Sequence, residues 1–295
     1  MTTNEWVFPR GSLAEGRWES VVGAEHPGWQ HTGIRVAELD GTITLPPSAA
    51  ERMIVPLAGS FVVSTAEERW MLEGRRSVFD GPTDVLYVGT MTGFRIEGVG
   101  RVAVAESPTT RQLPPSLLRR DRVPVEIRGA GRSTRQVHNF GVPGALAAHR
   151  LIVCEVVTPA ENWSSYPPHK HDSASASESE LEEIYYFESA VARGVQAPLD
   201  ARPFGMFTAY ASDHRAIETA ARVETGDIAL VPYGFHGPAV AAPGYDLYYL
   251  NVMAGPGAER AWRITDDPAQ AWIREHWSGE HPDPRLPYLS KETTQ

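Results

Sequence analysis

Short apolar runs separated by glycine and proline constrain the fold of this 295-residue chain more than any other feature. The 26 glycines and 24 prolines are spread along the whole sequence, where such residues interrupt strands and begin turns. Helical patterns do not alternate with these runs, which argues against a doubly wound parallel sheet. The sequence therefore predicts an all-β fold, with strands at 34–39, 52–57, 60–65, 84–88, 94–97, 151–157, 182–188, 204–210, 227–231 and 245–253.

The length of the chain permits two β units of ordinary size, each with its own core. Residues 107–124 contain three prolines and a short basic cluster, a composition typical of a connecting segment. We therefore expect an N-terminal unit at 1–110, a connection at 111–135 and a C-terminal unit at 136–295.

Two segments in the second half of the chain depart from the strand pattern. Asp267 and Pro268 supply an N-cap and a first-turn proline, and apolar or aromatic residues then recur at helical spacing between 272 and 277. This pattern predicts one short amphipathic helix that packs on the C-terminal unit. The small, polar and acidic residues at 173–180 predict a mobile loop.

The charge balance and the single cysteine limit the partners of the protein. The formal net charge is -10 and no long stretch gathers lysine and arginine, so we expect a small-molecule ligand and no nucleic-acid or anionic-membrane surface. Cys154 lies in an apolar run, which predicts a buried thiol, no internal disulfide and a reducing compartment. No segment reaches the ~20 apolar residues that span a bilayer, and no signal-peptide pattern opens the chain. We expect a cytoplasmic protein, and the sequence leaves a homo-oligomer open.

Three histidines indicate a metal site. His169 and His171 are separated by one residue, so on an extended strand their imidazoles point to the same side. His236 lies just past a Gly-Asp-Ile-Ala-Leu-Val-Pro run. Neutral imidazole is the commonest side-chain ligand for metal ions, and a pair on one strand supplies two ligands from one rigid element.

A carboxylate could join these histidines from the next predicted strand. Glu182 and Glu183 open that strand, and adjacent strand residues face opposite sides, so only one of them can point inward with the histidines. Glu183, Tyr185 and Phe187 share one face of the strand. A carboxylate among imidazoles suits zinc, manganese, iron or nickel.

The order of these motifs is similar to that of the cupin superfamily: His-x-His, a glutamate that opens an apolar strand, then Gly-x5-Pro-x-Gly and a histidine. Trp163 stands where the common cupin pattern has glycine, and the glutamate follows the His-x-His pair after a gap of eleven residues. The strings at 163–172, 181–187 and 243–256 resemble the 5-deoxy-glucuronate isomerase family of bacterial inositol catabolism. The resemblance covers nearly the whole chain and implies a bicupin, with two double-stranded β-helix barrels and a few short helices.

The resemblance also implies a metal site and a reaction. The ligands of one divalent ion, either zinc, manganese, iron or nickel, would be His169, His171, Glu183 and His236. The reaction would be the aldose-ketose isomerisation of 5-deoxy-D-glucuronate to 5-dehydro-2-deoxy-D-gluconate in myo-inositol degradation. A metal ion beside the carbonyl oxygen acts as a Lewis acid and stabilises the enediolate that forms when the neighbouring carbon loses its proton.

The N-terminal half resembles a decayed copy of the same motif. Glu51 leads an apolar strand, but Thr44-Leu45-Pro46-Pro47 stands where a His-x-His pair would be expected. No histidine occurs between His31 and His138. A second complete metal site is therefore not expected.

The residues that move the proton and bind the substrate carboxylate stay open at this point. His138, His149 and Tyr248 are candidates for the proton shuttle, beside a hydroxide on the metal or a carboxylate outside the ligand set. Arg202 and Lys170 are candidates for the carboxylate, which favours a cationic partner. Strand alternation directs Lys170 away from the histidines.

Three other functions fit part of this pattern. A related uronate ketol-isomerase would act on a pectin-derived 5-keto-4-deoxyuronate. A cupin dioxygenase would require iron and consume oxygen. A sugar-binding or regulatory cupin would bind its ligand without turnover, although no helix-turn-helix pattern supports a DNA-linked version.

Overall fold

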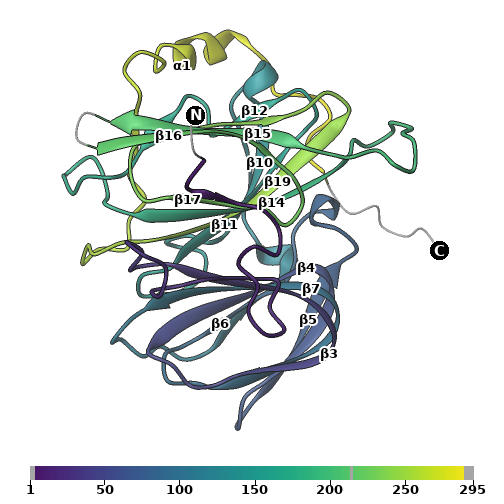
Figure 1. Ribbon diagram of the computed structural model, residues 1–295, viewed down its shortest axis with the longest axis vertical. Helices are drawn as coiled ribbons and strands as arrows, with labels where there is room; N and C mark the ends of the chain where they lie inside the picture. Colours follow the sequence, from purple (N-terminus) through teal and green to yellow (C-terminus); the bar gives the residue numbers. More distant parts are fainter. Residues whose placement is uncertain (1–3, 213–214, 289–295) are drawn as a thin grey trace.

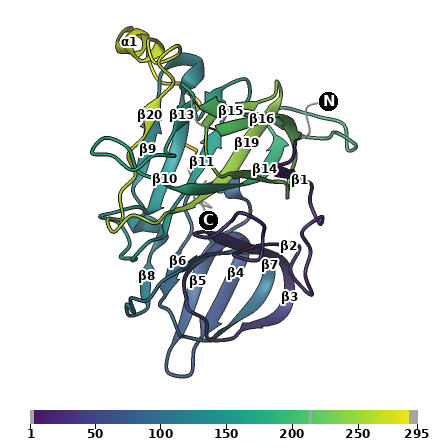
Figure 2. The same ribbon diagram turned by 60° about the vertical axis from the view of Figure 1, so that its left-hand side comes forward.

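The computed structural model describes residues 4–212 and 215–288, and nearly all of its regular structure is β-strand (Figure 1). Figures 1 and 2 show two units, a lower one coloured purple to blue and an upper one coloured teal to yellow. The prediction of an all-β chain is confirmed. Each of the ten predicted strands overlaps an observed one.

The lower, N-terminal unit is one antiparallel sheet with the strand order β2-β3-β7-β4-β6-β8, and β5 pairs with β4. Its strands are Ser20–Val22 (β2), Gly33–Leu45 (β3), Ala50–Ser64 (β4), Arg69–Arg75 (β5), Val85–Val88 (β6), Phe94–Pro108 (β7) and Ser116–Leu118 (β8). The predicted strands at 52–57 and 60–65 are both parts of β4. Gly59 lies between them but does not end the strand, because it pairs in register with Gly100 of β7, and a register shift between Pro56 and Ala58 forms a bulge just before it.

The upper, C-terminal unit consists of two sheets. The first, here called the interface sheet, has the order β1-β17-β14-β19-β11-β10-β9, and the second, the outer sheet, has the order β16-β15-β18-β13-β20, with β12 paired to β18. The interface sheet contains Val7–Phe8 (β1), Val125–Arg128 (β9), Arg135–Gly141 (β10), Ile152–Thr158 (β11), Glu182–Val191 (β14), Ile228–Val231 (β17) and Tyr245–Ala254 (β19). The outer sheet contains Trp163–Ser164 (β12), His169–Lys170 (β13), Gly205–Ser212 (β15), Arg215–Val223 (β16), Phe235–Ala241 (β18) and Thr265–Asp266 (β20).

The interface sheet separates two hydrophobic cores. Ile184 and Tyr186 on β14 pack against residues of the N-terminal unit such as Met53. Tyr185 and Phe187 on the same strand point the other way, into the core between the two sheets of the C-terminal unit. This alternation means that every second residue of β14 and β19 faces the interior of the C-terminal barrel.

The two units are interleaved at their boundaries. β1 belongs to the residues predicted for the N-terminal unit, but it pairs with β17 of the C-terminal unit. In Figure 1 the purple N-terminal segment accordingly runs along the upper unit before it enters the lower one. The predicted connection at 111–135 contains β8, which pairs with β6, and β9, which pairs with β10. The connection therefore extends both sheets.

The predicted C-terminal helix is present as a single turn. Ile273–His276 (α1) runs into the 3-10 turn Trp277–Gly279 (η4), at the top of Figure 1. Further 3-10 turns are Val78–Asp80 (η1), Arg120–Arg122 (η2) and Gly131–Ser133 (η3). No residue of α1 is buried, and Trp272 is 53% exposed, so the helix covers the barrel less than its amphipathic pattern predicted.

The segment 173–180 is closed by contacts that its composition did not predict. An isolated bridge joins Asp172 to Glu180. The buried carboxylate of Glu178 accepts hydrogen bonds from the backbone N–H groups of Asp172 and Ser173, at 2.9 and 3.1 Å. The acidic composition that suggested a mobile loop thus includes a side chain that holds the segment in place.

Cys154 is buried in the C-terminal core, as predicted. Burial raises the pKa of its thiol to about 12. Within the described part of the chain, no helix has the length and apolar character required to cross a membrane.

Candidate metal centre

Three buried histidines meet in the outer sheet of the C-terminal barrel. His169 on β13 is the register partner of His236 on β18, and His171 follows two residues after His169. One ring nitrogen from each histidine lies within 4.8 Å of the others. Strand pairing therefore brings together residues that are more than sixty positions apart in the sequence.

Hydrogen bonds orient two of these imidazoles. The Nδ1 atom of His171 lies 3.1 Å from the carbonyl oxygen of Leu181, and that of His236 lies 3.2 Å from the carbonyl oxygen of Gly234. Nδ1–H donation to a carbonyl leaves a lone pair on Nε2, which is the arrangement that metal-binding histidines adopt. The Nε2 atom of His236 is buried and has no hydrogen-bond partner. The donor set is therefore suited to a metal ion.

The carboxylate of Glu183 enters the same cluster from β14. Its Oε2 atom lies 3.0 Å from Nε2 of His171 and 3.0 Å from Nε2 of His236. Burial opposes ionisation, but the adjacent imidazoles of His171 and His236 hold the pKa of Glu183 well below its ordinary value. Burial and the neighbouring imidazoles lower the pKa of His169, which keeps it neutral. Burial opposes a charge on His171 as well, but the contact with Glu183 raises the pKa of His171. Metal binding uses the anionic carboxylate and neutral imidazoles, so an ion bound here would displace a proton from His171.

Glu182 points to the opposite side of β14, as strand alternation predicted. Its carboxylate accepts hydrogen bonds from the backbone N–H groups of Gln30, His31 and Thr32 at 2.7 to 3.3 Å. These residues belong to the N-terminal unit. Glu182 therefore joins the two units, while Glu183 faces the histidines.

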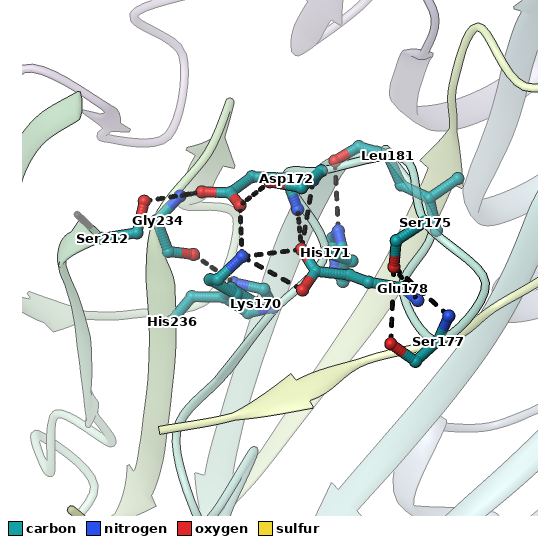
Figure 3. Close-up of polar contacts among 11 residues, drawn as sticks. Lys170, His171, Asp172, Ser175, Ser177, Glu178, Leu181, Ser212, Gly234 and His236 are labelled. Atoms are coloured by element: carbon teal, nitrogen blue, oxygen red, sulfur yellow. Dashed lines mark hydrogen bonds and ion pairs between the residues drawn. The ribbon is translucent and has the colours of Figure 1, made fainter. Parts of the chain in front are cut away.

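Lys170 lies among acidic side chains beside the histidine cluster (Figure 3). Its Nζ atom donates to Asp172 at 2.7 Å and to Glu178 at 2.8 Å. The other carboxylate oxygen of Asp172 accepts hydrogen bonds from the Gly234 N–H and the Ser212 hydroxyl. The ammonium group that was a candidate for substrate binding is thus occupied, and it ties together the segments that carry His171 and His236.

The candidates for the proton shuttle do not reach the histidine cluster. His138 and Tyr248 lie on the other face of the interface sheet, where both contact Glu155, at 2.6 and 2.7 Å. His149 lies 2.6 Å from the hydroxyl of Thr109. Strand alternation separates His138 and Tyr248 from the barrel interior. Arg202, the other candidate for the substrate carboxylate, is exposed in the segment before β15.

Three hydroxyl groups that were not among the candidates for the proton shuttle or the substrate carboxylate line the barrel beside the histidines. The Ser165 hydroxyl lies 3.2 Å from that of Tyr185 and 3.1 Å from that of Tyr249. The Tyr185 and His236 rings are 6.2 Å apart. The absence of a side chain at Gly237 permits the backbone of Ser165 to pack against it, because a Cβ atom at position 237 would lie 1.9 Å from the Ser165 carbonyl oxygen. The sequence did carry a signal for Tyr185, because strand alternation places Tyr185 on the same face as Glu183.

A family model described as the KduI/IolB family matches residues 7–273. The chain belongs to the KduI/IolB family. The 5-deoxy-glucuronate isomerase of Geobacillus kaustophilus strain HTA426 is 40% identical over 261 residues, which cover 86% of this chain and 90% of that protein. The 5-deoxy-glucuronate isomerase of Bacillus subtilis strain 168 is 39% identical over 76% of this chain and 80% of that protein.

Solved structures place this KduI/IolB chain among the cupins. The crystal structure of an IolB-like protein from Salmonella typhimurium LT2 superposes with a TM-score of 0.81, at 33% identity, over 91% of this chain and 99% of that one. An oxalate decarboxylase mutant of Bacillus subtilis superposes with a TM-score of 0.59 at 12% identity, over 99% of this chain and 88% of that one. The second likeness concerns the fold alone. The cupin fold expected from the motifs is thus confirmed.

Proposed function

We propose that this protein is a 5-deoxy-glucuronate isomerase, which converts 5-deoxy-D-glucuronate to 5-dehydro-2-deoxy-D-gluconate. The observation that carries the proposal is the presence of the buried three-histidine cluster in a chain that matches the named isomerases over most of its length. In the proposal, His169, His171, Glu183 and His236 bind one divalent metal ion. The reaction belongs to the degradation of myo-inositol in the cytoplasm, in agreement with the single buried cysteine.

The isomerisation reduces the aldehyde carbon to an alcohol and oxidises the neighbouring alcohol carbon to a ketone within one molecule. A proton leaves the carbon next to the aldehyde and is delivered to the aldehyde carbon. The hydroxyl group on the carbon that lost the proton gives up its O–H proton and becomes the ketone, and the aldehyde oxygen gains a proton and becomes a hydroxyl. The intermediate is an enediolate, and a divalent ion held by His169, His171, Glu183 and His236 would supply Lewis-acid stabilisation of its negative charge. Isomerisation requires no net redox partner, because the substrate is both oxidised and reduced.

The residues of the chain prepare the site for this chemistry. Carbonyl oxygens hold His171 and His236 with Nε2 directed at the centre, so little reorganisation is required on metal binding. Glu183 contributes one negative charge, so a divalent ion in the site retains a net positive charge toward the substrate oxygen. In the proposal, the hydroxyls of Ser165, Tyr185 and Tyr249, which contact one another beside the histidines, donate hydrogen bonds to substrate hydroxyl groups.

Incubation of purified protein with 5-deoxy-glucuronate tests the proposal. The protein is stripped with a chelator and reconstituted separately with zinc, manganese, iron and nickel, and the keto acid is measured by chromatography. We expect product with at least one metal and none after chelation. No product under any metal-replete condition would overturn the proposed reaction.

The same assay separates the alternatives. Faster turnover of a 5-keto-4-deoxyuronate would favour the related ketol-isomerase. Oxygen consumption would indicate a dioxygenase. Binding of 5-deoxy-glucuronate without product, measured by calorimetry, would indicate a sugar-binding cupin.

A further inference from the structure

Arg135 is a cation without an acidic partner in the C-terminal barrel. It lies on β10, where it shares a face with Val137, whose side chain packs in the barrel core. Its Nη1 atom donates to the carbonyl oxygens of Ser133 at 3.1 Å and Tyr166 at 3.4 Å. Among the residues that the structure describes, no carboxylate lies within 4.0 Å of this guanidinium. A half-buried charge without a counterion costs free energy, so its position calls for an explanation.

The neighbouring arginines do have acidic partners. Arg128 lies 2.8 Å from Glu126, and Arg274 lies 2.8 Å from Asp266. Burial and the charges of Arg128 and Arg274 lower the pKa of Arg135 to about 10, so it remains charged at neutral pH. Among these three arginines of the described part of the chain, Arg135 alone has no carboxylate in ion-pair contact, which leaves its guanidinium available to an added anion.

Arg135 is connected to the histidine cluster through a short chain of contacts. Tyr166, whose carbonyl it binds, directly follows Ser165. The Ser165 hydroxyl contacts Tyr185, whose ring lies beside His236. The charge of Arg135 also acts directly on Tyr249, the third member of that hydroxyl group. The segment that Arg135 binds therefore also carries a hydroxyl group that contacts the tyrosines beside the histidine cluster.

We infer that Arg135 binds the carboxylate of the uronic acid substrate, while the aldehyde end of the substrate lies at the histidine cluster. This inference rests on the proposed function. A uronic acid carries its carboxylate and its aldehyde at opposite ends of the carbon chain, which matches a cation and a metal centre separated by hydroxyl groups. Arginine also presents paired N–H donors that fit both carboxylate oxygens.

Binding of two unreactive analogues to the metal-loaded protein tests the inference. The acid analogue is 5-deoxy-glucuronate with its aldehyde reduced to an alcohol, and the neutral analogue is the polyol in which the carboxylate is reduced as well. Calorimetry gives the ratio of their dissociation constants for each variant. We expect wild type to prefer the acid by about ten- to a hundredfold, and Arg135→Gln to lose this preference. Arg135→Lys should retain part of it, because lysine keeps the charge but offers no planar fork.

Arg274→Gln is the matched control, because Arg274 stacks on the same Trp277 ring but already pairs with Asp266. It should keep the wild-type preference. A variant that merely distorts the barrel would weaken both analogues equally and leave their ratio unchanged. An unchanged ratio in a folded, metal-loaded Arg135→Gln variant would overturn the inference, as would a wild type that does not distinguish the analogues. Turnover of 5-deoxy-glucuronate by wild type is measured separately, so failure of the proposed function is recognised independently.

Discussion

The two units begin their central long strands in the same way but differ at the position that faces the barrel interior. In the C-terminal unit Glu183 pairs in register with Val231, the last residue of β17, and in the N-terminal unit Arg52 pairs in the same way with Val88, the last residue of β6. Arg52 forms an ion pair with Glu106 at 2.8 Å and donates to a backbone carbonyl. A guanidinium thus occupies the position of the histidine-facing carboxylate, which shows that the barrel alone does not create the site.

The preceding position has the same role in both units. Glu51 accepts hydrogen bonds from the backbone N–H groups of residues 149–151 of the C-terminal unit, at 2.5 to 2.8 Å. Glu182 does the same for residues 30–32 of the N-terminal unit. The sequence analysis interpreted Glu51 as the remnant of a metal ligand, but the residue that corresponds to Glu183 is the next one, Arg52. The counterpart of Glu51 is Glu182, and a shift of one residue on a strand exchanges the two faces.

Among changes that test the difference between the two units, removal of one histidine should have the largest effect on bound metal and activity. We expect His171→Ala and His236→Ala to lower bound metal to under about a tenth of the wild-type content and activity by at least about a hundredfold, because each imidazole supplies a ligand that the remaining groups cannot replace. Metal analysis by mass spectrometry and turnover of 5-deoxy-glucuronate provide the measurements. His149→Ala, outside the cluster, serves as the control. Equal metal content in all three variants would show that the cluster is not the metal site.

A comparison of the adjacent glutamates tests the inward and outward roles directly. Glu183→Gln should lower metal content and activity strongly, since an amide oxygen carries no charge. Glu182→Gln should retain the metal and instead destabilise the fold by about 1–3 kcal/mol, because the backbone N–H groups of 30–32 lose a charged acceptor. Metal analysis and urea denaturation separate the two effects. The reverse pattern would exchange the assignments.

The sequence predicted those parts of the structure that depend on local patterns. Strand positions and the opposite directions of Glu182 and Glu183 followed from alternation with a period of two. β16 was missed because its inward side chains include Thr219 and Ala221, which are too small or polar to mark a buried face. β10 was missed as well, and with it Arg135.

Other features depend on contacts between distant segments. His138 and Tyr248 share the partner Glu155, which lies against the N-terminal unit beside Arg75, and the sequence does not show this shared contact. The three hydroxyls near the histidines come from separate segments of the chain. Pairing of these segments is fixed by the closed barrel, and no local spacing records it.

The junction between the units should respond to acid. Burial opposes ionisation of Glu155, but the Arg75 guanidinium and the contact with His138 lower the pKa of the carboxyl to about 2 from an ordinary value of 4.5. A lowered carboxyl pKa stabilises the fold fully above pH 4.5, and this contribution is lost as the pH falls from 4.5 toward 2. Its size is on the order of 3 kcal/mol.

Denaturant titrations of wild type and Glu155→Gln at pH 7, 4 and 3 measure this contribution. We expect the variant to be less stable at pH 7, because Arg75 is left buried without its partner, and the difference between the proteins to shrink toward pH 3. A difference that stays constant with pH would show that ionisation of Glu155 does not stabilise the junction.

Replacement of Arg52 should have the smallest effect. It tests whether the N-terminal barrel contributes only to stability or also to metal binding and turnover. Arg52→Gln removes one ion pair of Glu106, but Arg35 still lies 3.0 Å from that carboxylate, so we expect a loss of only about 1–2 kcal/mol in unfolding free energy. Metal content and turnover should stay at wild-type values, because the position faces the interior of a barrel that offers no histidine between 31 and 138. A fall in bound metal without unfolding would mean that the N-terminal barrel affects the metal centre. The N-terminal unit would then contribute more than structural support to the C-terminal site.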